Sequence, residues 1–140
     1  MPAGYSGKPL YQKLGMVPGT TVCVINAPVD YEHRLEGISP DVKFSTSARG
    51  RFDIAHVFVV RRAELSRRLP GLVKAVAPDG AVWVSWPKKS AGVPTDLTED
   101  VIRELAFPLD LVDVKVCAID DTWSGLKLVI RKDRRALFKR

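Results

Sequence analysis

Hydrophobic residues occur along this chain in short runs that alternate with amphipathic stretches. The runs at residues 20–26, 52–60 and 81–86 are rich in β-branched and aromatic side chains. Such runs are typical of strands that are covered on both faces of a sheet. We therefore predict three buried strands at these positions and a short further strand at residues 42–44.

The segments between these runs have helical spacing. Leu65, Leu69, Leu72 and Val73 recur every three or four residues, which predicts one helix, and Pro70 within it predicts a kink or a break near Leu69. A second apolar stripe at residues 97–105 predicts another helix, with Asp96 or Thr98 as its N-cap. Weaker patterns indicate short helices at residues 9–14 and 29–36.

The last part of the chain predicts a hairpin. Residues 112–118 alternate between apolar and other side chains, residues 120–125 form a turn, and residues 126–130 return. Two strands joined this closely must be antiparallel. Together the elements predict a three-layer α/β/α sandwich of Rossmann-like type, with a mainly parallel sheet and a C-terminal antiparallel hairpin. One domain is expected at residues 1–130, followed by a basic tail at residues 131–140.

Composition is consistent with one packed core. The chain has 140 residues, of which 46% are hydrophobic, and no apolar stretch long enough to cross a membrane. The N-terminal residues lack a signal pattern, so a cytoplasmic location is predicted. Cys23 and Cys117 each lie within an apolar run without a metal-ligand partner at suitable spacing. We expect reduced thiols and no metal site.

The net charge of +6 is concentrated at the C-terminal end. Residues 131–140 hold six basic side chains and one acid, whereas residues 1–130 hold 16 basic and 15 acidic side chains. A basic tail can bind polyanions, but it is more often a solvated end. Binding of nucleic acid through this tail is therefore the weakest of the functions considered.

Several sequence segments in the chain resemble those of known families. One set of segments resembles a reduced class I S-adenosylmethionine-dependent methyltransferase. It consists of the glycines and prolines of residues 14–19, the strand opening at residues 52–54, residues 72–84 and the closing hairpin. Residues 4–7, 24–28, 86–89, 95–100 and 121–127 are similar to the domain-of-unknown-function 3052 family of small bacterial proteins. The second resemblance implies a compact bacterial domain and no particular activity.

The chain departs from the methyltransferase pattern where a cofactor would bind. Asn26-Ala27-Pro28 follows the first strand in place of a glycine-rich turn, and Pro28 has no N–H to donate. Residues 43–46 offer no acid to receive the ribose hydroxyls. We therefore predict no cofactor.

A candidate ligand site follows from the expected topology. Parallel strands deliver their following residues to one edge of the sheet, where open α/β proteins bind ligands. In such a site Asn26 would donate hydrogen bonds to an anionic ligand, and positive charge would come from Arg61, Lys88 and Lys89. Trp86 would lie at the end of the adjacent strand. The alternative is that these basic groups are solvated and that Asn26 caps local backbone.

Three other features have structural explanations. Trp123 is either an exposed interface residue or a cover for the end of the core. His56 lies among apolar residues of the central strand, which favours a buried neutral histidine. Asp120 and Asp121 lie in a turn, where carboxylates accept from backbone N–H groups more often than they hold Mg²⁺.

The first functional interpretation is a non-catalytic module that binds a protein partner or an anionic small molecule, with a homodimer as an alternative assembly. The second interpretation is a divergent S-adenosylmethionine-dependent methyltransferase, or another transferase with a nucleotide cofactor. An enzyme is the less expected class, because no serine or cysteine has an activating partner that the sequence reveals.

Overall fold

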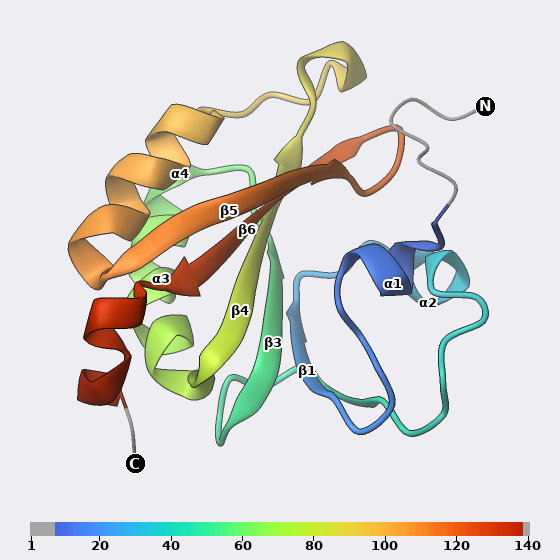
Figure 1. Ribbon diagram of the computed structural model, residues 1–140. Helices are drawn as coiled ribbons and strands as arrows, with labels where there is room; N and C mark the ends of the chain where they lie inside the picture. Colours follow the sequence, from blue (N-terminus) through green and yellow to red (C-terminus); the bar gives the residue numbers. More distant parts are fainter. Residues whose placement is uncertain (1–7, 139–140) are drawn as a thin grey trace.

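A single six-stranded sheet organises the computed structural model, which describes residues 8–138 (Figure 1). The strands are β1 (Thr21–Ile25), β2 (Lys43–Ser45), β3 (Phe52–Phe58), β4 (Val76–Pro87), β5 (Leu111–Ala118) and β6 (Trp123–Ile130). Their order across the sheet is β2-β1-β3-β4-β6-β5. Strands β1 to β4 are parallel, and β6 pairs antiparallel with both β4 and β5. The predicted fold class is confirmed.

Helices cover both faces of this sheet. The face that carries α3 (Arg62–Ala75) and α4 (Glu99–Ala106) holds the larger core cluster. The opposite face is covered by α1 (Leu10–Lys13) and α2 (Tyr31–Arg34), which are only four residues long. Short 3₁₀ helices follow at η1 (Lys89–Ala91), η2 (Phe107–Leu109) and η3 (Lys132–Phe138).

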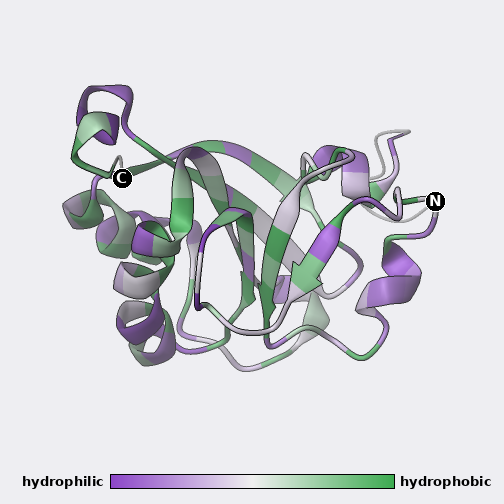
Figure 2. Ribbon diagram, turned by 90° about the horizontal axis from the view of Figure 1, so that it is seen from below, coloured by the Kyte–Doolittle hydropathy of each residue, from purple (hydrophilic) through white to green (hydrophobic). Residues whose placement is uncertain are grey.

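The strands are buried on both faces, as their composition predicts. In β1, Cys23 and Ile25 pack under α3 and α4, whereas Val22 and Val24 face α1 and α2. This alternation follows from the two-residue period of a strand. Figure 2 shows the result, with hydrophobic strands inside and helices that are hydrophilic on their outer sides.

The hairpin is present, but it folds back into the sheet. The antiparallel strand β6 lies between β4 and β5, so the strand at the edge is β5, which runs parallel to β1 to β4. The predicted antiparallel hairpin therefore forms this side of the sheet, with its second strand on the inner side. Sequence spacing predicts that two strands pair, but not which of them contacts the rest of the sheet.

Of the kink and the break that Pro70 predicted near Leu69, the break does not occur, since α3 is one continuous helix through Pro70. Leu65, Leu69 and Leu72 are almost fully buried on one side of it. The apolar face on both sides of the proline packs against the sheet, and this tertiary packing outweighs the local cost of the proline.

For α4, the structure selects one of the two predicted caps. Thr98 is the N-cap, and its hydroxyl oxygen accepts a hydrogen bond from the backbone N–H of Val101 at 3.2 Å. Asp96 instead accepts from the backbone N–H of Arg62 at 2.6 Å, which joins the start of α3 to the loop before α4.

The described part of the basic C-terminal segment lies against the domain. Arg131 and Arg134 both approach the carboxylate of Asp110, and Phe138 packs against the core. Two of the basic groups in this segment are thus already paired within the fold. Among residues 8–138, no helix has the length and apolar character that a membrane crossing requires.

Candidate functional site

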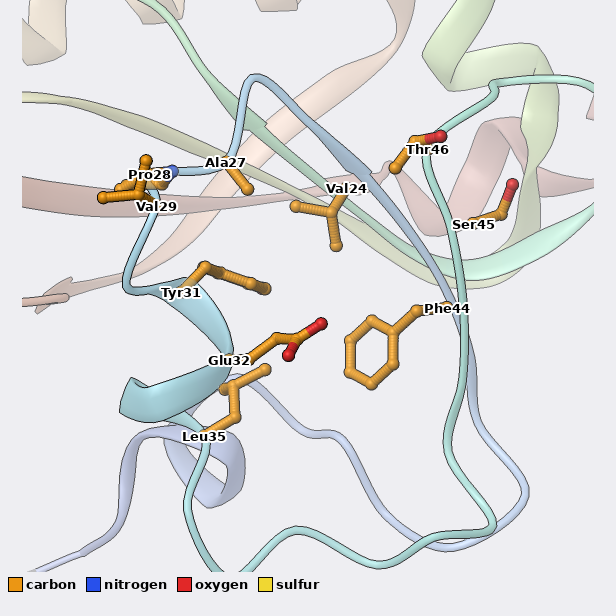
Figure 3. Close-up of a pocket in the computed structure, with 10 residues that line it drawn as sticks. All are labelled: Val24, Ala27, Pro28, Val29, Tyr31, Glu32, Leu35, Phe44, Ser45 and Thr46. Carbon is orange, nitrogen blue, oxygen red and sulfur yellow. The ribbon is translucent and has the colours of Figure 1, made fainter.

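A pocket of about 560 Å³ opens beside the carboxyl ends of β1 and β2 (Figure 3). Its lining comes from β1, from the loop after it, from α2 and from the end of β2: Val24, Ala27, Pro28, Val29, Tyr31, Glu32, Leu35, Phe44, Ser45 and Thr46. The chain passes from β1 to β2 on one side, and β3 then lies on the other side of β1. This reversal of strand order is where open α/β sheets bind ligands.

Most of the lining is apolar. Phe44 is 45% exposed in the short edge strand β2, which is unusual for so large an aromatic side chain. Figure 3 shows the ring of Phe44 and the carboxylate of Glu32 pointing toward each other across the pocket. Among the described residues of the lining, Glu32 is the only charged one. The pocket therefore suits a flat, largely apolar ligand without a net negative charge.

The loop after β1 is held in a left-handed turn by Asn26, whose φ is +60°. Glycine most readily adopts this conformation, and asparagine is one of the few other residues that tolerate it. The Asn26 amide donates to the backbone carbonyl of Phe58 at 3.1 Å and to the carboxylate of Glu64 at 2.9 Å. Asn26 thus joins β1 to the end of β3 and to α3.

Glu64 is itself fixed by a second donor. The Arg68 guanidinium donates to the same carboxylate oxygen at 2.8 Å, and this hydrogen bond lowers the pKa of Glu64. The amide of Asn26 therefore meets an ionised acceptor, which strengthens the turn. Both of its N–H groups are used within the fold.

Arg61, Lys88 and Lys89 follow parallel strands at this edge of the sheet. None of the five predicted ligand-binding residues, Asn26 and Trp86 included, belongs to the described lining of the pocket. Arg61 is exposed at the N-cap of α3, and Lys89 is exposed in η1. Trp86 is buried in the core under α3 and α4. The backbone N–H of Lys88 donates to the carbonyl of Thr122, which joins this loop to the hairpin turn.

Trp123 is partly buried against the core on the α1 and α2 side. Its ring meets that of Phe58 edge to face, with centroids 5.1 Å apart. In the preceding turn, the carboxylate of Asp120 accepts from the backbone N–H groups of Thr122 and Trp123 at 2.8 and 2.7 Å. It also approaches Arg34 at 3.1 Å. The turn explanation of Asp120 is confirmed.

A buried polar chain lies directly under the pocket. The hydroxyl of Tyr31 lies 2.8 Å from Nδ1 of His56, and Nε2 of His56 lies 2.7 Å from Oγ of Ser85. Burial lowers the pKa of His56 to about 3 and raises that of Tyr31. The burial of His56 predicted from the sequence is confirmed, and its lowered pKa favours the neutral form. Its two partners were missed, because the three residues come from α2, β3 and β4.

The hydrogen-bonded residues Tyr31, His56 and Ser85 do not form a nucleophilic site. His56 and Ser85 are fully buried, and only the ring of Tyr31 reaches the pocket lining. A substrate cannot approach the serine oxygen. Their hydrogen bonds satisfy the polar groups inside the core, and they fix the Tyr31 ring as a wall of the pocket.

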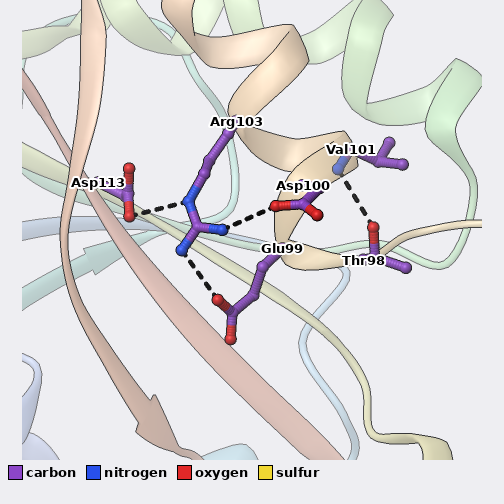
Figure 4. Close-up of polar contacts among 6 residues, drawn as sticks. All are labelled: Thr98, Glu99, Asp100, Val101, Arg103 and Asp113. Carbon is purple, nitrogen blue, oxygen red and sulfur yellow. Dashed lines mark hydrogen bonds and ion pairs between the residues drawn. The ribbon is translucent and has the colours of Figure 1, made fainter.

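A second cavity of about 600 Å³ lies between α4 and β5. Its main polar group, the guanidinium of Arg103, donates to Asp113, Asp100 and Glu99 at 2.9 to 3.0 Å (Figure 4). The hydrogen bond with Asp113 is the largest contribution to the raised pKa of Arg103. Because Asp113 belongs to β5 and the other two carboxylates belong to α4, Arg103 fastens α4 to β5 and its guanidinium donors are used within the fold.

Comparison with solved structures identifies the class of fold. A magnesium protoporphyrin IX methyltransferase from Synechocystis PCC 6803 with bound SAM aligns with a TM-score of 0.57 at 15% identity, over 88% of this chain and 74% of that one. A SAM-dependent methyltransferase from Aquifex aeolicus aligns with a TM-score of 0.62 at 8% identity, over 86% and 87%. The fold is therefore methyltransferase-like.

Sequence comparison adds no family. No family model and no curated protein matches this chain. Membership of the domain-of-unknown-function 3052 family remains a prediction. At 8 to 15% identity, the structural likeness concerns the fold alone.

Proposed function

We propose that this chain is a divergent S-adenosylmethionine-dependent methyltransferase, with the cofactor bound in the pocket between β1, α2 and β2. The observation that carries the proposal is the position of the pocket. It lies at the carboxyl ends of β1 and β2, beside the reversal of strand order, in a fold like that of methyltransferases.

The lining fits the nucleoside part of this cofactor. The exposed ring of Phe44 offers a face on which a purine can stack, with Val24 and Leu35 as further apolar contacts. The carboxylate of Glu32 is an acceptor for ribose hydroxyls. In this proposal Glu32, from α2, does the work of the acid that residues 43–46 lack.

Charge favours this cofactor over nucleotides. A phosphorylated nucleoside would bring negative charge against Glu32, and no cation among the described lining residues would offset it. S-adenosylmethionine carries a sulfonium cation and no phosphate. When bound, it supplies an activated methyl group. The chain's own residues hold the nucleoside and shield it from water.

The second candidate is the non-catalytic binding module of our first interpretation. It is favoured by Ala27 and Pro28, which place a methyl group and a proline ring in the pocket lining and leave no N–H at Pro28. The amino-acid part of the cofactor would need backbone donors in that region. This candidate predicts that the pocket binds neither S-adenosylmethionine nor its demethylated product.

Isothermal titration calorimetry with S-adenosylmethionine, S-adenosylhomocysteine and ATP separates the two candidates. We expect saturable binding of the first two and none of ATP. Phe44→Ala should weaken binding about tenfold through the lost stacking surface. Phe107→Ala removes an exposed ring outside the pocket lining and is the control.

Glu32→Gln should weaken binding, whereas Glu36→Gln, an exposed acid just beyond α2, should leave it unchanged. Transfer of labelled methyl groups from S-adenosylmethionine to components of a cell extract then tests catalysis. Binding of S-adenosylmethionine without methyl transfer would support the cofactor pocket but would count against a methyltransferase. Absence of binding in the calorimeter would refute the methyltransferase proposal.

A further inference from the structure

A separate cleft of about 480 Å³ lies on the same face of the sheet, between α1 and the β5–β6 hairpin. Its lining combines basic, small and apolar side chains: Lys8, Lys13, Lys115, Val116, Cys117, Ala118 and Ser124. It shares no residue with the pocket near β2. Three lysines therefore line one cleft, and no carboxylate belongs to its described lining.

The fold, and not the local sequence, gathers this charge. Lys8 and Lys13 belong to the N-terminal segment around α1, whereas Lys115 belongs to β5. Both Lys13 and Lys115 act on the half-buried thiol of Cys117, where they lower its pKa against the stronger effect of burial. Two of the ammonium groups therefore lie close enough to add their fields inside the cleft.

A fourth lysine increases the local repulsion. Lys127 of β6 is the direct cross-strand partner of Lys115 in the antiparallel pair. Like charges in directly opposed positions destabilise a sheet. Within residues 8–138, Lys8, Lys115 and Lys127 make no ion pair. This repulsion would be relieved by an anion bound between the strands and α1.

We propose that this cleft binds a small organic phosphate. Its dianionic group lies among Lys8, Lys13 and Lys115, with the hydroxyl of Ser124 as an additional donor. The organic part rests on Val116 and Ala118. The cleft volume lies within the range of small-molecule sites, about 300 to 1,000 Å³.

A small ligand fits these observations better than a nucleic acid. A nucleic acid needs an extended basic surface that follows its backbone. Here the lysines line one cleft that also has apolar walls, and residues 1–130 as a whole are nearly neutral. The site is independent of the proposed methyltransferase function, since it uses other residues.

Titration of the full chain with phenyl phosphate and with inorganic phosphate, followed by calorimetry, tests the proposal. We expect saturable binding of phenyl phosphate, which Lys115→Gln and Lys8→Gln each weaken about tenfold through loss of a charge-assisted contact. Lys132→Gln removes the same charge from an exposed position on η3 and should leave the affinity unchanged. An equal loss in all three variants would show that only overall charge matters, and it would overturn the proposal.

Thermal unfolding provides a second measurement. Lys115→Gln should raise the Tm in the absence of ligand, because it removes the repulsion with Lys127. At the same concentration, phenyl phosphate should raise the Tm of the wild type more than that of Lys115→Gln. Absence of any ligand effect on the wild type would contradict a built site. If a single-stranded oligonucleotide bound more tightly than phenyl phosphate, and if this binding depended on Lys115, the ligand of the cleft would be a polyanion. That result would also overturn the proposal.

Discussion

The hydroxyl of Tyr31 lies 2.8 Å from Nδ1 of His56, and through this contact a wall of the pocket is tied to the centre of the sheet. His56 is fully buried in β3, and Ser85 of β4 lies on its other side. The position of the Tyr31 ring therefore depends on a histidine that must remain neutral. The protonation state of His56 links pH to the stability of this face.

Acidification should destabilise the protein through His56. In the folded state its pKa is lowered to about 3, whereas an unfolded histidine titrates near 6.5. Between these values the unfolded chain binds the extra proton, so the stabilisation is complete above about pH 6.5 and is lost as the pH falls toward 3. The loss attributable to this residue should approach about 1 kcal/mol per pH unit.

Urea unfolding of the wild type and of His56→Gln at pH 7, 5.5 and 4 measures this effect. The variant should be less stable at pH 7, and the difference should shrink as the pH falls. His33→Gln, which removes an exposed imidazole, should follow the wild type. Parallel pH profiles for the wild type and His56→Gln would contradict the assignment.

Gly80 is required by a close approach of two backbones. β4 is irregular between Val76 and Ala81, and a Cβ atom at Gly80 would collide with the carbonyl oxygen of Asp53. Because neither backbone can yield easily, Gly80→Ala should lower the free energy of unfolding by about 2 to 3 kcal/mol.

Gly71 provides the matched control for this substitution. It lies in α3, and a Cβ there would meet nothing within 4 Å. Gly71→Ala should therefore stabilise the protein, by about 0.5 to 1 kcal/mol, through helix propensity. Chemical denaturation of both variants checks the pair. A Gly80→Ala protein as stable as the wild type would mean that β3 and β4 are not so close.

Pro70 should be a local weakness in α3. It cannot donate the hydrogen bond that the carbonyl of Ser66 would otherwise accept within the helix. Pro70→Ala should restore this bond and raise the free energy of unfolding by about 1 kcal/mol or more. Ser66→Ala improves helix propensity alone and should gain about 0.5 kcal/mol at most. A lower Tm for Pro70→Ala would indicate that the proline shapes the contact with the sheet.

The case of Pro70 illustrates what the sequence could and could not predict. Local rules predicted the elements, because buried strands and amphipathic helices have distinct periods. They failed at Pro70, where packing of Leu65, Leu69 and Leu72 overrides a local penalty. They also failed to place β6 inside the sheet, since strand neighbours are decided by contacts distant in sequence.

The same limit applies to the sites. The expected topology alone predicts that residues at the ends of parallel strands lie at one edge of the sheet. This rule predicted a ligand site with Asn26, Arg61, Trp86, Lys88 and Lys89. The importance of Phe44 could not be predicted, because its exposure depends on the edge position of β2. Likewise, Lys8 and Lys115 lie far apart in the chain and meet only through the packing of α1 beside the hairpin.

The turn after β1 offers the sharpest test of how the pocket works. Asn26 already supplies the left-handed conformation, so what separates this turn from a glycine-rich one is the bulk of Ala27 and the missing N–H of Pro28. In the double variant Ala27→Gly/Pro28→Gly the side-chain bulk is gone and one donor is restored. If S-adenosylmethionine binds here, one added hydrogen bond of about 1 kcal/mol should raise its affinity about fivefold.

Calorimetry on this variant should be compared with Val17→Gly. Val17 is exposed in the loop before β1 and does not line the pocket, so its replacement loosens a neighbouring loop and the affinity should stay at the wild-type value. A weaker interaction in the double variant would show that the rigid turn is itself part of the site. If neither the wild type nor the double variant binds the cofactor, bulk at positions 27 and 28 is not the obstacle, and the pocket serves a ligand of another class.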